Sequence, residues 1–315
     1  MIANDYVYEL ASNDEERGLR LLETRTLLES NVKYRLVRSK AAVDPSRSPF
    51  IKSRLSVLFE GDRLEDIADR VGVIELNGAT FKVHALDHDD PAEGGKFDYD
   101  RKRAMEREIG YRFRGKAEMR SPDREFGFAR MGGRWLFGEL ARGQAVWLKH
   151  KEKPREYSTA LSTRVARAVV NIAVPRIEGV RAIDPCCGIG TVLVEAASMG
   201  IEIEGRDVNP LAAVGARENL AHFGYGGSVP VTLGDMREIT GQYDAAVIDM
   251  PYNLCSVLSP REKLEMLRSA RAFANRIVVV TLEDLDSIVA EAGFDILDRC
   301  TVNKGKFVRQ VLICE

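Results

Sequence analysis

Short apolar runs and helical patterns alternate along the C-terminal half of the chain. The apolar runs lie at residues 180–185, 201–208, 229–235, 243–250 and 276–281. Stretches with the helical spacing of apolar residues lie at residues 191–200, 210–224 and 259–274. Strands that alternate with helices are typical of a mostly parallel β-sheet with helices on both faces. The pattern therefore predicts a Rossmann-like α/β domain.

Two more β-rich runs end the chain, at residues 294–302 and 307–315. The turn between them, Asn303 to Lys306, is too short to contain a helix. Strands this close in sequence pair as an antiparallel hairpin. We therefore expect an antiparallel strand at the end of the parallel sheet.

The N-terminal half has a different pattern, which predicts a mixed α+β region. Gly132-Gly133 lies between apolar and aromatic runs and signals a hairpin. The other predicted elements are strands at 5–11 and 77–86 and helices at 14–30 and 101–113. The polar segment 149–158, which carries Pro154, marks the domain boundary. We predict an N-terminal domain at residues 1–155 and a C-terminal domain at 156–315.

The composition is that of an ordinary folded protein. Charged residues make up 30% of the 315 residues and hydrophobic residues 45%, which argues against extensive disorder. No apolar run reaches the roughly 18 to 20 residues of a membrane helix, and the first residues lack a signal-peptide pattern. We therefore expect a cytoplasmic protein without a membrane partner.

Cysteines and histidines give no basis for a metal site. The five cysteines are odd in number, and their spacing fits neither a disulfide framework nor a zinc site. None of the four histidines has a partner at metal-ligand spacing. We expect reduced thiols and no bound metal.

The segment after the first C-terminal strand predicts a nucleotide or nucleoside site. Asp184 ends the strand, and a short loop with Gly188 and Gly190 leads into a helix. Glycines at such a turn let the backbone approach a ligand closely. The acid before the loop and the lack of a third glycine argue against a dinucleotide fingerprint.

Acidic residues also end the next two strands. Asp207 is placed to accept hydrogen bonds from ribose hydroxyls. Asp235 is placed for an adenine amine, with the amide of Met236 close by for a ring nitrogen. Each acid alone would equally suit a helix cap. Together they lie at the carboxyl ends of successive strands, where open α/β sheets bind ligands.

The fourth strand leads into Asp249-Met250-Pro251-Tyr252-Asn253. This segment resembles the D/N-P-P-Y motif of amino methyltransferases, and the preceding DPCCGIG is similar to their first cofactor motif. The C-terminal hairpin also fits their seven-stranded sheet. The resemblance implies S-adenosylmethionine as cofactor and an exocyclic amine as methyl acceptor.

The motif residues have clear chemical roles in such a reaction. Asp249 and the Met250 carbonyl accept hydrogen bonds from the two N–H groups of the amine, which directs the nitrogen lone pair towards the methyl donor. Pro251 fixes the loop, and Tyr252 offers a face on which a flipped base stacks. Met250 departs from the motif, because the family usually has its first proline there. A competing mechanism uses a cysteine thiolate, for which Cys255 is the nearest thiol in sequence.

The N-terminal half resembles RNA-binding modules. Residues 81–149 are similar to a THUMP domain through FKVHAL, RKRAMEREIG, SPDREFGF and the hairpin that follows. The first strand and helix resemble the ferredoxin-like domain that precedes THUMP in archaeal tRNA guanosine-N2 methyltransferases. Between Arg101 and Arg120, eight basic residues outnumber three acidic ones. The predicted phosphate contacts are Arg101, Arg103, Arg107 and Lys149.

The resemblance therefore implies a tRNA guanine-N2 methyltransferase, with tRNA as its partner. Two alternatives stay open. One is an amino methyltransferase that acts on DNA or ribosomal RNA, although the N-terminal half shows no base-reading motif. The other is a non-catalytic RNA-binding scaffold, against which the intact motif acids argue. The sequence does not reveal whether a partner subunit is needed.

Overall fold

The chain folds into two compact units. The computed structural model describes residues 5–11, 15–31, 33–157, 160–251, 258–304 and 307–315. The first unit comprises Met1–Ser12 and Leu28–Gln144, and the second comprises Asn13–Leu27 and Ala145–Glu315. The sequence pattern predicts a boundary near residue 155, whereas the units divide between Gln144 and Ala145.

The second unit is built on a seven-stranded sheet in the order β12-β13-β11-β10-β7-β8-β9. Its strands are β7 (Arg181–Asp184), β8 (Glu202–Asp207), β9 (Val231–Leu233), β10 (Tyr243–Asp249), β11 (Ala274–Thr281), β12 (Ile296–Lys304) and β13 (Phe307–Cys314). The first five strands are parallel to one another, whereas β13 is antiparallel to both β11 and β12. The predicted Rossmann-like sheet with a C-terminal hairpin is therefore confirmed.

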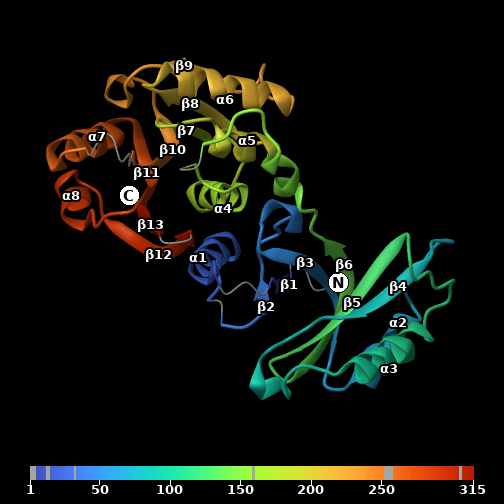
Figure 1. Ribbon diagram of the computed structural model, residues 1–315. Coiled ribbons are helices and arrows are strands. Elements are labelled where there is room, and N and C mark those ends of the chain that lie inside the picture. Colours follow the sequence, from blue (N-terminus) through green and yellow to red (C-terminus); the bar gives the residue numbers. More distant parts are fainter. Residues whose placement is uncertain (1–4, 12–14, 32, 158–159, 252–257, 305–306) are drawn as a thin grey trace. The chain divides into compact units, whose positions relative to one another are not determined.

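Helices cover both faces of this sheet, as the alternating pattern predicted (Figure 1). They are α4 (Thr163–Ala173), α5 (Thr191–Ser198), α6 (Pro210–His222), α7 (Pro260–Phe273) and α8 (Asp286–Glu291). Short 3-10 turns η3 (Val146–Lys151) and η4 (Met236–Glu238) complete the unit. Residues 245–248 of β10 and 277–280 of β11 are all buried, as expected for parallel strands covered on both faces.

The helix predicted at 14–30 forms as α1 (Arg17–Leu28), but nearly all of it belongs to the second unit. Glu23 and Asn171 of α4 are both fully buried, and the Asn171 amide donates to Glu23 Oε1 at 2.6 Å. Arg25 also pairs with Asp298 of β12 at 2.9 Å. The second unit is therefore not a contiguous C-terminal segment, because long-range contacts assign α1 to it.

The first unit is an α+β fold around a six-stranded sheet in the order β2-β1-β3-β6-β5-β4. The strands are β1 (Tyr6–Leu10), β2 (Leu36–Ser39), β3 (Ile51–Gly61), β4 (Phe81–Ala85), β5 (Arg124–Met131) and β6 (Arg134–Arg142). Its helices are α2 (Leu64–Val71) and α3 (Tyr99–Gly110), with 3-10 turns η1 (Pro45–Arg47) and η2 (Pro91–Glu93). All neighbouring strands are antiparallel except β4 and β5.

Strand alternation divides the core of the first unit between the two faces of its sheet. On β6, Trp135 and Phe137 pack in the cluster that includes α2 and α3, whereas Leu136 packs in the other cluster. Successive side chains of a strand point to opposite faces, which explains this division. Gly132 and Gly133 both have positive φ, at 60° and 75°. They form the predicted hairpin between β5 and β6.

Four elements were not predicted from the sequence. The strand β2 and the helix α8 have only four and six residues and give a weak periodic signal. The helix α2 does carry a helical pattern, since Leu64, Ile67, Ala68 and Val71 are its buried residues, and this signal was overlooked. The long strand β3 was missed because polar residues occupy some of its inward positions. Ser53, for example, is fully buried and donates to Glu9 Oε2 at 3.1 Å.

We expect Glu23→Ala to lower the free energy of unfolding by about 1–3 kcal/mol, because it leaves the buried Asn171 amide without this acceptor. Glu291→Ala is the control, since it breaks only an exposed pair with Arg268 and costs about 0–1 kcal/mol. Denaturant unfolding of both variants measures the difference. Equal stability losses would show that α1 is not an integral part of the second unit.

Candidate functional site

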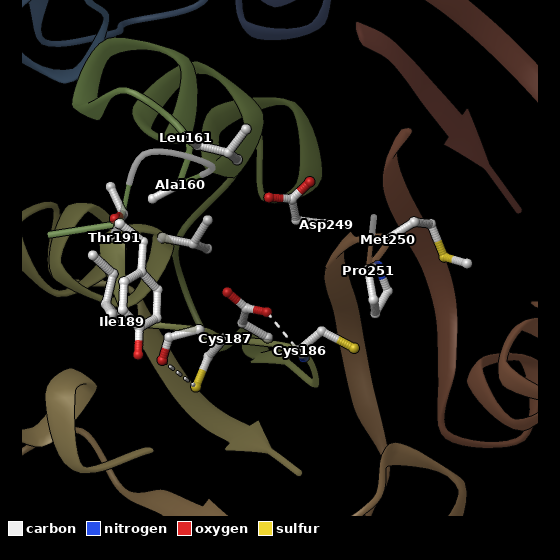
Figure 2. Close-up of a pocket in the computed structure, with 13 residues that line it drawn as sticks. Ala160, Leu161, Cys186, Cys187, Ile189, Thr191, Asp249, Met250 and Pro251 are labelled. Carbon is white, nitrogen blue, oxygen red and sulfur yellow. Dashed lines mark hydrogen bonds between the residues drawn. The ribbon is translucent and has the colours of Figure 1, made fainter. Parts of the chain in front are cut away.

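A pocket lies at the carboxyl ends of β7 and β10 in the second unit. Its volume is about 130 Å³. Figure 2 shows Asp249 and Pro251 on one side of it and Ala160, Ile189 and Thr191 on the other. The full lining is Tyr157, Ala160, Leu161, Asp184, Cys186, Cys187, Gly188, Ile189, Thr191, Val192, Asp249, Met250 and Pro251. The two segments with the clearest sequence motifs therefore meet at one cavity.

Hydrogen bonds join the loop after β7 to the end of β8. The Gly188 amide donates to Asp207 Oδ2 at 2.7 Å, and the Asn209 amide donates to Asp207 Oδ1 at 2.8 Å. Asp207 is only half-buried. Each carboxylate oxygen accepts more than one hydrogen bond, so Asp207 retains acceptor capacity for a ligand hydroxyl.

The two glycines of the loop serve different purposes. Gly190 caps α5 with φ of 78°, and a Cβ there would lie 3.1 Å from the Ala216 Cβ on α6. A Cβ on Gly188, where φ is 52°, would meet no atom within 4 Å. Gly188 lines the pocket, whereas Gly190 allows α5 to pack closely on α6.

Asp184 is a buried carboxyl, 2% exposed, at the end of β7. Its Oδ1 accepts a hydrogen bond from the Cys186 amide at 3.2 Å. Burial raises the pKa of Asp184 well above its usual value, and the nearby Asp249 and Asp207 carboxylates raise it further. A cationic ligand in the pocket would offset this accumulation of negative charge.

Asp235 is already engaged by its own loop. Both of its carboxylate oxygens pair with the Arg237 guanidinium, and Oδ1 also caps η4 through the Arg237 amide at 2.8 Å. The Arg237 side chain holds the pKa of Asp235 below its usual value. The neighbouring Met236 side chain is buried, with Sδ 3.7 Å from the Cys186 Sγ. Neither residue lines the pocket, so an adenine contact at this position stays a prediction.

The structure gives a physical reason for methionine at position 250. The Met250 amide donates to the Val280 carbonyl at 2.9 Å, a bond that proline, which has no N–H, would lose. The Met250 side chain is 3% exposed and packs in the hydrophobic core, away from the pocket (Figure 2). The strand pairing and this packing restrain the loop in place of a proline ring. Tyr252 lies outside the described residues.

One wall of the pocket was missed from the sequence. Tyr157, Ala160 and Leu161 precede α4 and line the cavity opposite the β10 loop. Ser162 caps α4, accepting from the Val165 amide at 3.3 Å. Ser162, directly before the first helical residue Thr163, was the available signal for this turn. The sequence held no signal that these residues reach the pocket, because they meet the Asp249 segment from far away along the chain.

The thiols beside the pocket are poor nucleophiles. Burial, reinforced by nearby carboxylates, raises the pKa of Cys186 and that of Cys187. The thiolate is the reactive form of cysteine. Cys186 and Cys187 are therefore poorly suited to a thiolate mechanism, and Cys255 lies outside the described residues.

The predicted phosphate-binding residues fall in different units. Arg101, Arg103 and Arg107 are exposed on α3 of the first unit, whereas Lys149 is exposed in η3 of the second.

Within the described residues, no cluster of His, Cys, Asp and Glu is arranged to hold a metal ion. No helix in the described part of the chain is long and apolar enough to cross a membrane.

Residues 151–284, which contain the pocket motifs, match the family described as UPF0020: RMKL-like, methyltransferase domain. The matched segment includes both the glycine loop and the Asp249 segment.

Curated relatives extend the comparison to part of the chain. A tRNA (guanine(10)-N2)-dimethyltransferase of Methanothermobacter thermautotrophicus is 30% identical over 174 residues, which cover 52% of this chain and 51% of the relative. The enzyme of the same name from Pyrococcus abyssi is 30% identical over 163 residues, 48% of each. The chain thus spans about half the length of the curated relatives it matches.

Solved structures share the fold over nearly the whole chain. The crystal structure of TrmN from Thermus thermophilus aligns with a TM-score of 0.50 at 18% identity and covers 99% of both chains. A structure described as a methyltransferase complexed with SAH aligns with a TM-score of 0.50 at 12% identity, over 98% of this chain and 97% of its own. These likenesses extend beyond residues 151–284 into the N-terminal half.

We expect Asp184→Asn to flatten the pH dependence of stability. A carboxyl whose pKa is raised on folding stabilises the fold below its unfolded value, near 3.8, and this contribution is lost as pH rises through the folded pKa. Asparagine keeps an oxygen for the Cys186 amide but does not ionise. Denaturant unfolding between about pH 5 and pH 8 gives the free energy of unfolding of wild type and of Asp184→Asn as a function of pH. Equal pH dependence in the two proteins would contradict a raised pKa at Asp184.

Proposed function

We propose that the chain is an S-adenosylmethionine-dependent methyltransferase that acts on the exocyclic N2 amine of a guanine in tRNA. The observation that carries the proposal is the meeting of Asp249 with the Asp184 and Gly188 loop at one pocket of the segment that matches the UPF0020 family. The names of the two curated relatives support guanine N2 as the target and tRNA as the substrate.

The residues present fit a cationic nucleoside cofactor. Asp207 retains acceptor capacity for ribose hydroxyls beside the Gly188 amide. Asp184 and Asp249 line the same cavity, and a bound cation would favour the ionised form of Asp184, whose pKa burial raises in the protein alone. When bound there, S-adenosylmethionine supplies an activated methyl group. Asp235 would contribute an adenine contact if it shares its oxygens with Arg237.

The chain's own residues position the acceptor amine. Asp249 ends β10 at the pocket, and its carboxylate accepts one N–H of the amine. The Met250 carbonyl accepts the second, with the backbone held by the bond to Val280. Positioning of this kind supplies most of the rate in a transfer from an activated donor. In the proposal, Pro251 fixes the loop, and Tyr252 stacks on the flipped base.

The first unit is proposed to bind the RNA. Its exposed arginines on α3 suit phosphate contacts, and its resemblance to THUMP points to tRNA. Whether a small partner subunit is needed is decided by the activity of the purified chain alone. We also propose that the enzyme is cytoplasmic.

We expect the purified full chain to transfer labelled methyl groups from S-adenosylmethionine to tRNA. Mass spectrometry of the digested nucleosides should find the label in N2-methylguanosine or N2,N2-dimethylguanosine, with ribosomal RNA and DNA unlabelled in parallel reactions. Label in methyladenine or methylcytosine would overturn the guanine assignment. No label in any nucleic acid would favour the scaffold or the need for a partner.

Asp249→Ala is the matched variant in the same assay. It should reduce methyl transfer at least about a hundredfold while cofactor binding stays within a few-fold of wild type. Asp249→Asn keeps one acceptor oxygen and should retain more activity than the alanine variant. Full activity of Asp249→Ala would refute the role of Asp249 in orienting the amine.

A further inference from the structure

The first unit contains a second cavity, between α3, β4 and the segment 110–119. Its volume is about 620 Å³, within the range of roughly 300–1,000 Å³ typical of small-molecule sites. Its floor is formed by Phe81, Val83 and Phe113, which are buried. The rings of Phe81 and Phe113 stack with centroids 4.3 Å apart. The floor is thus flat, apolar and supported by the core.

The rim of this cavity carries exposed large side chains. Tyr99, Tyr111 and Met119 line it and are 70%, 84% and 55% exposed. Large apolar side chains that surround a cavity and remain exposed together are typical of binding surfaces. Tyrosine in particular combines an apolar ring with a polar tip that tolerates solvent.

Positive charge lies on the same rim. Arg103 and Arg107 of α3 both line the cavity, and the Arg103 guanidinium lies 5.3 Å from the Tyr99 ring centroid. Two acids line it as well. Asp100 is exposed at the start of α3, and the two oxygens of Glu106 accept from the Ala85 amide and from Arg103. The rim therefore combines aromatic faces with guanidinium groups, which suits a chain of stacked bases and phosphates.

The outer edge of β4 is blocked, which disfavours a peptide bound by strand addition. The Phe81 amide donates to the Lys116 carbonyl at 3.1 Å, and the Glu118 amide donates to the Phe81 carbonyl at 2.9 Å. Lys82 Nζ also donates to the Met119 carbonyl at 2.8 Å. Strand addition requires free backbone groups at a sheet edge, and the chain itself occupies them at Phe81.

We propose that this groove binds unpaired nucleotides of RNA, with Tyr111 and Tyr99 stacking on bases and Arg103 and Arg107 contacting phosphates. A base within a duplex has both faces covered, so only unpaired nucleotides present a face to the tyrosines. The inference rests on the proposed function, since it names the part of an RNA substrate that the first unit holds. It adds aromatic residues and a cavity to the arginine contacts expected from the sequence.

Fluorescence anisotropy with the full chain tests the groove directly. The probes are a fluorescein-labelled single-stranded RNA of mixed sequence and a hairpin-free duplex of the same sequence. We expect the single strand to bind more tightly, Tyr111→Ala to weaken its binding about tenfold, and Tyr111→Phe to bind as wild type. Arg107→Gln should weaken binding and reduce its salt dependence. Arg261→Gln, an exposed arginine on α7, is its charge control.

Three results would contradict the proposal that this groove binds unpaired nucleotides. They are equal binding by Tyr111→Ala and wild type, tighter binding of the duplex, and displacement of the RNA by polyglutamate as effective as by unlabelled RNA. Methylation of tRNA by the same variants separates the two proposals. Oligonucleotide binding that depends on Tyr111, without any tRNA methylation, would refute the proposed function but support RNA binding in the groove. Normal methylation by Tyr111→Ala, with unchanged oligonucleotide binding, would refute only RNA binding in the groove.

Discussion

The hydrogen bond from the Gly188 amide to Asp207 is the interaction on which the candidate site depends. It ties the loop after β7 to the end of β8, at the edge where parallel strands present their carboxyl ends. The pairing of β10 with β7 brings Asp249 to the same edge. In an open α/β sheet this edge is the usual ligand site, so the pairing of these strands fixes the relative positions of Asp184, Asp207 and Asp249.

Electrostatics makes this arrangement costly without a ligand. Burial of Asp184 beside Asp249 and Asp207 raises its pKa, and a cavity with this charge favours a cation over an anion or a neutral molecule. Burial raises the pKa of Cys186 and Cys187, and the same carboxylates raise it further.

The residues predicted from the sequence are those whose roles depend on local order along the chain. Strand ends, the glycine loop and the C-terminal hairpin follow from periodicity and turn chemistry, and the structure has them close to the predicted bounds. Contacts between distant segments were not predictable. The placement of α1 depends on Glu23 meeting Asn171, the wall at Leu161 depends on its meeting the Asp249 segment at the pocket, and the groove under Tyr111 depends on the segment 116–119 covering β4. None of these pairings leaves a periodic signal in one sequence.

Isothermal titration of the full chain with S-adenosylmethionine, for wild type and Asp207→Ala, tests whether the strand-end acids form the pocket of a cationic nucleoside cofactor. We expect one-to-one binding that Asp207→Ala weakens more than tenfold, since hydrogen bonds to a charged group are lost, and that Glu291→Ala leaves unchanged. No binding by wild type, or equal binding by Asp207→Ala, would contradict this role of the acids.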